Sequence, residues 1–238
     1  MKVTLINYTQ DAEELLIFTK NTRLSMTAIN FEQVSRLNLK TDDELNYIAN
    51  TIQSSWEFID YVFMVEGVSR AYTHQQVRTR AASYAQQSMR VSNMGDFDYI
   101  YSNKILQDER AFHSVNFVLA KIKEGYNELI AMGIPPEDAR GILPTNISTN
   151  IVCKFNLRTF SELVKSRSGG RTQTEYQNVI KLMTDEVLEV HPWAEKFIFN
   201  QKRDYYDDIE SFAEREYGDD LIKKGELLKI VDKMRKEK

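Results

Sequence analysis

The chain has 238 residues, of which 42% are hydrophobic and 11% aromatic, and it carries a net charge of −4. These values argue against a disordered chain and predict one or two sizeable cores within one domain over residues 1–238. The negative net charge argues against nucleic acid as a partner. Because no apolar run approaches roughly 18 residues and no secretory segment opens the sequence, we expect a cytoplasmic protein with no membrane partner.

The first fifty residues predict one strand and two helices. The segment Lys2–Tyr8 has the composition of a strand, and apolar residues at helical spacing begin at about Asp11. A second helix is predicted from Thr41, because Thr41 and Glu44 match a capping box ahead of further apolar residues at helical spacing.

A second strand is predicted at Phe58–Gly67, where residues alternate with a period of two. Val62 and Met64 are apolar on the second face of this strand, which predicts that both of its faces are covered. Ser69 follows at a position where its hydroxyl can cap a short helix that carries the next arginine, histidine and glutamine residues, up to Arg78.

The rest of the chain is predicted to be largely helical. A long amphipathic helix is expected from Asn103 to about Met132, where apolar residues recur every three, four or seven positions before Gly133. The remaining predicted elements are a helical turn opened by Pro136, a strand at Asn146–Phe155, helices near Arg158–Val164 and Gln173–Val190, and a charged terminal helix after about Asp208. Because strands and helices mix without regular alternation, we assign the α+β class with a mixed or antiparallel sheet.

Arginines gather in residues 66–91, the most informative segment. Arg70, Arg78, Arg80 and Arg90 lie among few acidic residues and are interleaved with glutamines and serines. Guanidinium groups supply the fork of donors that suits a phosphate, and glutamine amides can both donate to and accept from a pyrimidine edge. A solvated basic face or a structural ion-pair cluster produces the same pattern, so this segment alone does not decide between them.

The segment resembles the signature of the flavin-dependent thymidylate synthase family, which runs arginine, histidine, arginine, seven variable residues, serine, and arginine two positions later. The corresponding residues here are Arg78-Thr79-Arg80, the seven residues AASYAQQ, and Ser88-Met89-Arg90. Further blocks in the family's order are SSWE at 54–57, PEDARGILP at 136–144, FNLR at 155–158, Arg167, and TQTEY at 172–176. Several separate matches in order, over roughly residues 50–180, identify the chain as a divergent member of this family.

The resemblance implies two groups of site residues. The residues implied to bind the pyrimidine deoxynucleotide are Gln75, Gln86, Gln87, Ser88, Arg90, Arg140 and Arg167. The residues implied to bind FAD are Ser54, Glu57, Arg78, Thr79, Arg80, Asn156 and Arg158. Arg167 and Ser88 are implied at the catalytic centre, Ser88 as a substrate-binding group rather than a nucleophile. We therefore expect Arg90, Arg140 and Arg167 to converge on one nucleotide monophosphate, at an interface between subunits of a homotetramer.

The resemblance also implies a reaction, in which a one-carbon unit passes from methylenetetrahydrofolate to C5 of dUMP and gives dTMP. FAD is the implied cofactor and NADPH the implied reductant. An arginine held against the carbonyl that becomes enolate-like would stabilise the developing negative charge. The family uses no cysteine nucleophile, and the single cysteine here, Cys153, lies outside the matched blocks. We expect no metal site, and one cysteine cannot form an intrachain disulfide.

The sequence departs from the family at its histidines. Thr79 stands at the central histidine of the signature, and Ile52, Phe58 and Arg171 stand at three further histidine positions. All four substitutions bear on the flavin and folate side of the implied site. They leave three hypotheses open: a divergent synthase, an enzyme that hydroxymethylates C5 of dUMP or dCMP, and a nucleotide-binding homologue without catalysis.

Overall fold

The structure is a computed structural model in which two compact units are found, Met1–Ile198 and Phe199–Lys238, and each is described by itself. The residues that the structure describes are 1–22, 31, 41–92, 94–169, 172–199, 209, 212–213, 216–217 and 220–236. The second unit contains α12 (Leu221–Lys236), which confirms the predicted terminal helix. The first unit contains every predicted site residue. That residues 1–238 form a single domain stays a prediction.

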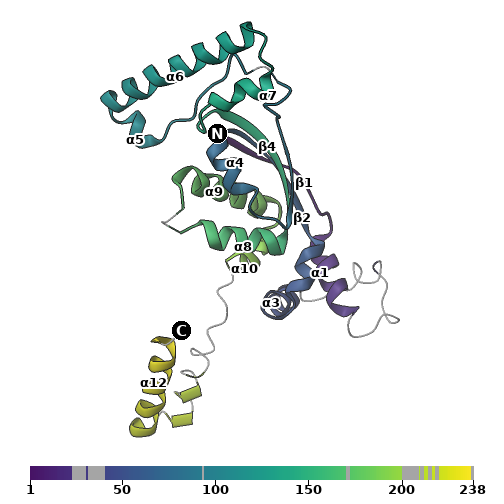
Figure 1. Ribbon diagram of the computed structural model, residues 1–238. Coiled ribbons are helices and arrows are strands. Elements are labelled where there is room, and N and C mark those ends of the chain that lie inside the picture. The colour runs from purple at the N-terminus through teal and green to yellow at the C-terminus, as the bar shows by residue number, and fades with distance from the viewer. Residues whose placement is uncertain are drawn as a thin grey trace. The chain divides into compact units, whose positions relative to one another are not determined.

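A four-stranded antiparallel sheet forms the centre of the first unit (Figure 1). Its strands are β1 (Lys2–Tyr8), β2 (Asp60–Ser69), β3 (Ala82–Gln86) and β4 (Ser148–Asn156), in the spatial order β1-β2-β4-β3. The three predicted strands are confirmed, with small shifts at the ends of β2 and β4. The sequence does not predict β3, which lies within the seven variable residues of the signature. The α+β class with an antiparallel sheet is confirmed.

One face of the sheet carries the core. The buried core side chains on the two central strands include Tyr61, Phe63, Val65, Ile151, Cys153 and Phe155. The helices α4 (Arg70–Gln76), α8 (Leu157–Arg167) and α9 (Thr174–Val190) lie on one side of the sheet (Figure 1). On α8, the Phe160 ring stacks on Phe63 at a centroid distance of 5.6 Å. Because these helices share one side, Val62 and Met64 on the other side are only half-buried, which corrects the prediction that both faces of β2 are covered.

Further helices lie beyond the two ends of the sheet (Figure 1). Those toward one end are α1 (Ala12–Asn21), α3 (Thr41–Thr51) and the 3-10 helix η1 (Gln53–Phe58). Those toward the other end are α5 (Asn103–Leu106), α6 (Glu109–Ala131), α7 (Pro136–Ala139) and the 3-10 helix η2 (Arg140–Ile142). After α9 follow η3 (Pro192–Ala194) and α10 (Glu195–Ile198). The helix predicted from Thr41 is confirmed, while the Thr41 side chain of its capping box lies outside the described residues. None of the described helices could span a membrane.

The long helix predicted over residues 103–132 is interrupted between α5 and α6. Asp108 accepts a hydrogen bond from the Ala111 amide at 3.0 Å, and this side-chain cap starts α6 as a new helix. Gly133 adopts a positive φ of 82° just after α6, as expected of a glycine that ends a helix. α6 buries Tyr126 in a second, smaller core, which includes Phe97.

Candidate functional site

The arginine-rich segment begins where β2 passes into α4. Ser69 caps α4 as predicted, because its hydroxyl oxygen accepts a hydrogen bond from the Tyr72 amide at 3.1 Å. Glu175 on α9 accepts hydrogen bonds from the Ser69 amide and hydroxyl, at 2.7 and 2.6 Å. These contacts fix the start of the segment to α9. α4 ends at Gln76, so Arg78 lies in the following turn rather than on the helix as predicted.

The turn that carries Arg78, Thr79 and Arg80 is held by β3. The Tyr84 hydroxyl lies 2.8 Å from the carbonyl oxygen of Gln76 and 2.8 Å from that of Thr79, so its single proton serves both acceptors. Burial raises the pKa of Tyr84, which keeps this hydroxyl protonated. The backbone of the turn is therefore fixed, while the side chains of Arg78 and Arg80 are exposed.

The two glutamines at the end of β3 are hydrogen-bonded to other segments. The Gln86 amide nitrogen donates to the hydroxyl oxygens of Thr73 and Thr149, at 3.0 and 3.2 Å. The Gln87 carbonyl accepts a hydrogen bond from the Arg70 guanidinium. These contacts tie the chain before Ser88 to α4 and β4.

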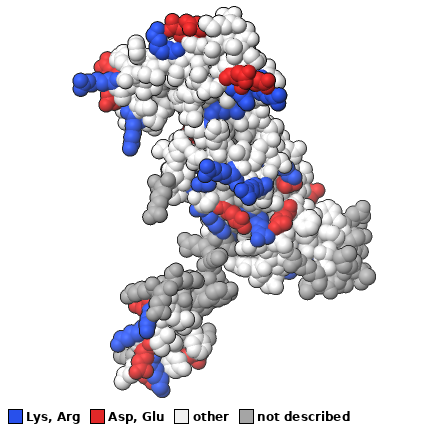
Figure 2. All heavy atoms as spheres, in the orientation of Figure 1, with Lys and Arg blue, Asp and Glu red and all other residues white. Residues whose placement is uncertain are grey.

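Arg90 and Arg140 meet at Glu137. The Arg90 amide donates to the Ser88 hydroxyl oxygen at 3.2 Å, and Arg90 Nε pairs with the Glu137 carboxylate at 2.6 Å. Arg140 Nε donates to the Glu137 carbonyl at 3.1 Å. Figure 2 shows acidic side chains against basic ones in this part of the molecule, near α7. The structure thus brings together two of the three arginines that are predicted to converge on one nucleotide monophosphate.

Arg167 lies at the end of α8, beside α9. Its guanidinium carbon is 5.3 Å from the centroid of the Tyr176 ring, and its Nε is buried without a hydrogen-bond partner among the described residues. Burial raises the pKa of Tyr176 to about 12, while Arg167 acts in the opposite direction. The Gln75 amide donates to Gln173 at 2.6 Å. No described hydrogen bond or ion pair joins Arg167 to the arginines at Glu137, so the convergence of three arginines stays a prediction.

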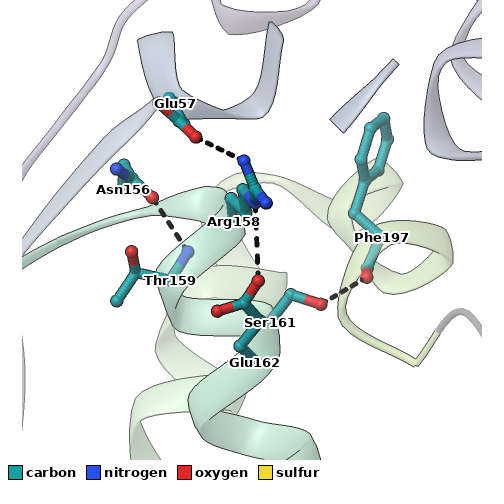
Figure 3. A network of polar contacts seen from close by, with 7 residues as sticks. All are labelled: Glu57, Asn156, Arg158, Thr159, Ser161, Glu162 and Phe197. Atoms are coloured by element: carbon teal, nitrogen blue, oxygen red, sulfur yellow. Dashed lines mark hydrogen bonds and ion pairs between the residues drawn. The ribbon is translucent and has the colours of Figure 1, made fainter. Parts of the chain in front are cut away.

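The predicted flavin residues near α8 form a polar network (Figure 3). Arg158 points toward Glu57 on η1, and its Nη1 pairs with the carboxylate at 2.7 Å. This hydrogen bond raises the pKa of the Arg158 guanidinium. Asn156 caps α8 by accepting a hydrogen bond from the Thr159 amide at 2.8 Å. Ser54, also on η1, is exposed. The network joins two sequence blocks that the resemblance assigns to one binding surface.

Residues 4–193 match the family model described as thymidylate synthase complementing protein. The chain belongs to this family. Its relatives include flavin-dependent thymidylate synthases of Sulfurisphaera tokodaii, 30% identical over 203 residues, and of Sulfolobus acidocaldarius, 31% identical over 202 residues. Both alignments cover 83% of this chain, and they cover 77% and 76% of those relatives. A flavin-dependent thymidylate synthase of Clostridium tetani is 30% identical over 213 residues, which cover 81% of this chain and 84% of that protein.

Three of the four positions at which the resemblance implies a histidine lie beside the predicted flavin residues. Thr79 contributes one of the two carbonyls that Tyr84 holds. Ile52 immediately precedes η1, and Phe58 ends it with 57% of its surface exposed. Arg171 lies outside the described residues. The three described substitutions therefore border η1 or the signature turn, and none of them is among the residues that meet at Glu137.

Sequence reasoning missed three residues that position the site in this family member. They are Tyr84, which holds the signature turn, Glu137, which joins two arginines, and Glu175, which fixes the cap of α4. Each lies inside a block that resembles the family, although the resemblance assigned no role to it. Membership of those blocks was the signal that could have pointed to all three.

The Cys153 thiol should be unreactive in the native protein. It is buried on β4, and burial raises its pKa to about 12, so very little thiolate exists at neutral pH. We expect no labelling by a thiol reagent until denaturant is added, and normal dUMP turnover by folded Cys153→Ala. Rapid labelling of the native protein, or lost turnover in a variant of normal stability, would contradict this assignment.

Proposed function

We propose that this protein methylates C5 of dUMP to give dTMP, with methylenetetrahydrofolate as the one-carbon donor, FAD as cofactor and NADPH as reductant. The observation that carries this proposal is the family match over residues 4–193, together with relatives named flavin-dependent thymidylate synthases. Two features of the structure support it: the arginines gathered at Glu137, and the separate network of Glu57 and Arg158.

The nucleotide phosphate is proposed to bind Ser88, Arg90 and Arg140. The pair with Glu137 engages Nε of Arg90, so the two Nη groups can still form hydrogen bonds to phosphate oxygens. The glutamines proposed at the sugar and base are Gln75, Gln86 and Gln87. Their amides can pair with a uracil or a cytosine edge, so these residues fit both dUMP and dCMP.

Arg167 is proposed to act on the pyrimidine ring. Its Nε is buried without a partner among the described residues, and the guanidinium is proposed to donate to a substrate carbonyl. Tyr176 lies against the guanidinium and limits its movement. A cation fixed in this way would stabilise the negative charge on the carbonyl that becomes enolate-like, the form of the ring in which C5 is nucleophilic. Ser88 is a binding group in this proposal, because its hydroxyl contacts the Arg90 amide and no described base contacts it.

The residues at η1, the signature turn and α8 fit the polar part of a flavin nucleotide. Arg78 and Arg80 are exposed guanidinium groups on a backbone that Tyr84 fixes, which suits the pyrophosphate of FAD. Glu57 and Arg158 hold each other in place, and Ser54, Thr79 and Asn156 complete the proposed contacts. When bound, reduced flavin supplies the hydride. The chain's own contribution is to bind and orient the cofactor beside the nucleotide.

We propose a homotetramer in which the nucleotide and flavin groups of one site come from different subunits. Within one chain, no described contact joins the arginines at Glu137 to Glu57 and Arg158. α6 also exposes apolar side chains, with Phe117 70% and Val118 53% accessible. A neighbouring subunit would cover such side chains and complete the site.

A second candidate function rests on one difference from the pattern that the resemblance implies. Ile52, Phe58 and Thr79 replace histidines on the flavin and folate side, whereas the proposed nucleotide residues are retained. If these substitutions alter how flavin and folate bind, the last step of the reaction would change. Water would then add in place of hydride, and the product would carry a hydroxymethyl group at C5 of dUMP or dCMP. A nucleotide-binding homologue without catalysis would keep the same nucleotide residues and would not bind FAD.

The purified protein should be yellow and should bind FAD, as followed by flavin absorbance and fluorescence during titration. Because exposed guanidinium groups are proposed to hold the pyrophosphate, replacing Arg78 and Arg80 by glutamine should weaken FAD binding. Arg110→Gln, which removes an exposed charge from α6, is the matched control and should bind FAD normally. A colourless protein that takes up no FAD would favour the homologue without catalysis.

A further inference from the structure

Arg70 occupies a position that is fixed by its backbone. Its amide donates to the Ile147 carbonyl at 3.1 Å, and the next amide, of Ala71, donates to the Thr145 carbonyl at 2.8 Å. The preceding residue, Ser69, is bound by both carboxylate oxygens of Glu175. The start of α4 is therefore attached to two other segments, and the Arg70 side chain leaves the backbone from a well-defined point.

The Arg70 guanidinium extends from α4 to the segment that precedes Ser88. Its Nη2 donates to the Gln87 carbonyl, while its Nε is buried without a partner among the described residues. Burial lowers the pKa of Arg70, and the nearby charge of Arg140 lowers it further. The Arg70 guanidinium thus lies at the Gln87 carbonyl, next to Ser88, which is proposed to bind phosphate.

The other paired arginines of the site have carboxylate partners. Arg90 pairs with Glu137, and Arg158 pairs with Glu57 and, at 3.4 Å, with Glu162. Among the described residues, no carboxylate pairs with Arg70, whose guanidinium donates to the Gln87 carbonyl. A partly buried cation beside a second cation is unfavourable until an anion joins them. A phosphate dianion can accept hydrogen bonds from both guanidinium groups at once.

We propose that Arg70 is a further phosphate-binding residue, which acts together with Arg140 on the 5′-phosphate of the nucleotide and holds the Gln87–Ser88 segment against it. This inference rests on the proposed function, since it assumes that the cluster receives a nucleotide. The ligand chemistry is a phosphomonoester dianion, which dUMP and inorganic phosphate share. The base and sugar play no part in this contact.

Binding of dUMP and of deoxyuridine to the full-length protein tests the proposal, with Arg70→Gln, Arg70→Lys and Arg110→Gln as variants. We expect Arg70→Gln to raise the Kd of dUMP at least tenfold and to leave that of deoxyuridine within twofold. Arg70→Lys retains the positive charge without the planar guanidinium, so it should raise the Kd of dUMP less than Arg70→Gln does. Arg110→Gln should match the wild type for both ligands. Inorganic phosphate should compete with dUMP for the wild-type protein, and it should compete more weakly for Arg70→Gln.

Several outcomes would overturn the proposal. An equal rise in the Kd of dUMP and of deoxyuridine in Arg70→Gln would show that Arg70 has a structural role. An unchanged Kd of dUMP would show that Arg70 does not bind the phosphate. If Arg70→Gln does not fold, Arg70→Lys decides by the same comparison of the two ligands. Failure of the wild type to bind dUMP would overturn the proposed function and this inference together. Normal dUMP binding by both Arg70 variants would overturn this inference alone.

Discussion

Arg167→Ala and Arg90→Ala should each weaken dUMP binding by more than about 1.5 kcal/mol, which corresponds to a rise in Kd of roughly tenfold or more. Each substitution removes a charged hydrogen-bond donor that is proposed to bind the nucleotide. The Arg167 guanidinium lies over the Tyr176 ring, and its Nε is buried without a partner among the described residues. No other described cation lies over the Tyr176 ring to replace it in Arg167→Ala. Calorimetric titration of the purified variants with dUMP measures both effects. Arg110→Ala on the exposed surface of α6 serves as the control, and wild-type affinity in both site variants would remove the assigned site.

Mixing Arg90→Ala with a variant of the flavin side, Arg158→Ala, tests the proposed homotetramer. If one site takes Arg90 from one subunit and Arg158 from another, subunit exchange between Arg90→Ala and Arg158→Ala creates some sites with both arginines. Part of the dUMP turnover should then return on mixing. If each site lies within one subunit, mixed assemblies contain only defective sites and no turnover returns.

Acidification should destabilise the protein through His191. This histidine is buried, its Nδ1 lies 3.0 Å from the Tyr61 hydroxyl, and the rings of Tyr8 and Trp193 pack around it at centroid distances of 5.2 and 4.9 Å. Burial lowers its pKa from 6.5 to about 4 in the folded protein. The unfolded chain therefore binds a proton at a higher pH than the folded chain does. The resulting stability is present above pH 6.5 and is lost as the pH falls toward 4, with a total of roughly 3 kcal/mol.

Urea unfolding at about pH 7 and about pH 4.5 measures this loss. His191→Phe cannot be protonated, so its free energy of unfolding should fall less between the two pH values than that of the wild type. His113→Gln is the matched control, because the His113 side chain is 73% exposed on α6. An equal fall in the wild type and His191→Phe would show that His191 does not set the acid sensitivity.

The sequence predicted the fold where local signals were strong. β1 occupies the predicted range, Lys2–Tyr8. Ser69 caps α4, as predicted from its position just before the short helix. β3 was missed because Ala82–Gln86 lacks the β-branched residues that favour strands, and its pairing with β4 is long-range. The break before α6 was missed because apolar spacing continues across Asp108, whereas a side-chain cap decides where the helix starts.

The contacts of the candidate site could not be predicted in the same way. Resemblance to a family indicated which arginines and glutamines belong to it, while the partners that position them are distant in sequence. Glu137 meets Arg90 across 47 positions, and Glu57 meets Arg158 across 101. Tyr84 holds the signature turn through carbonyl groups, which every residue carries, so no residue type in the turn marks this contact. Such contacts are visible only once the sheet and helices are assembled.

Mass spectrometry of the product formed from dUMP, methylenetetrahydrofolate, FAD and NADPH is the most direct test of the proposed methylation. We expect a mass increase that corresponds to one methyl group, and its loss when FAD is omitted. Two results would contradict the assignment of this chain as a synthase of dTMP. One is a mass increase that corresponds to a hydroxymethyl group, and the other is unchanged dUMP after incubation with protein that has bound FAD.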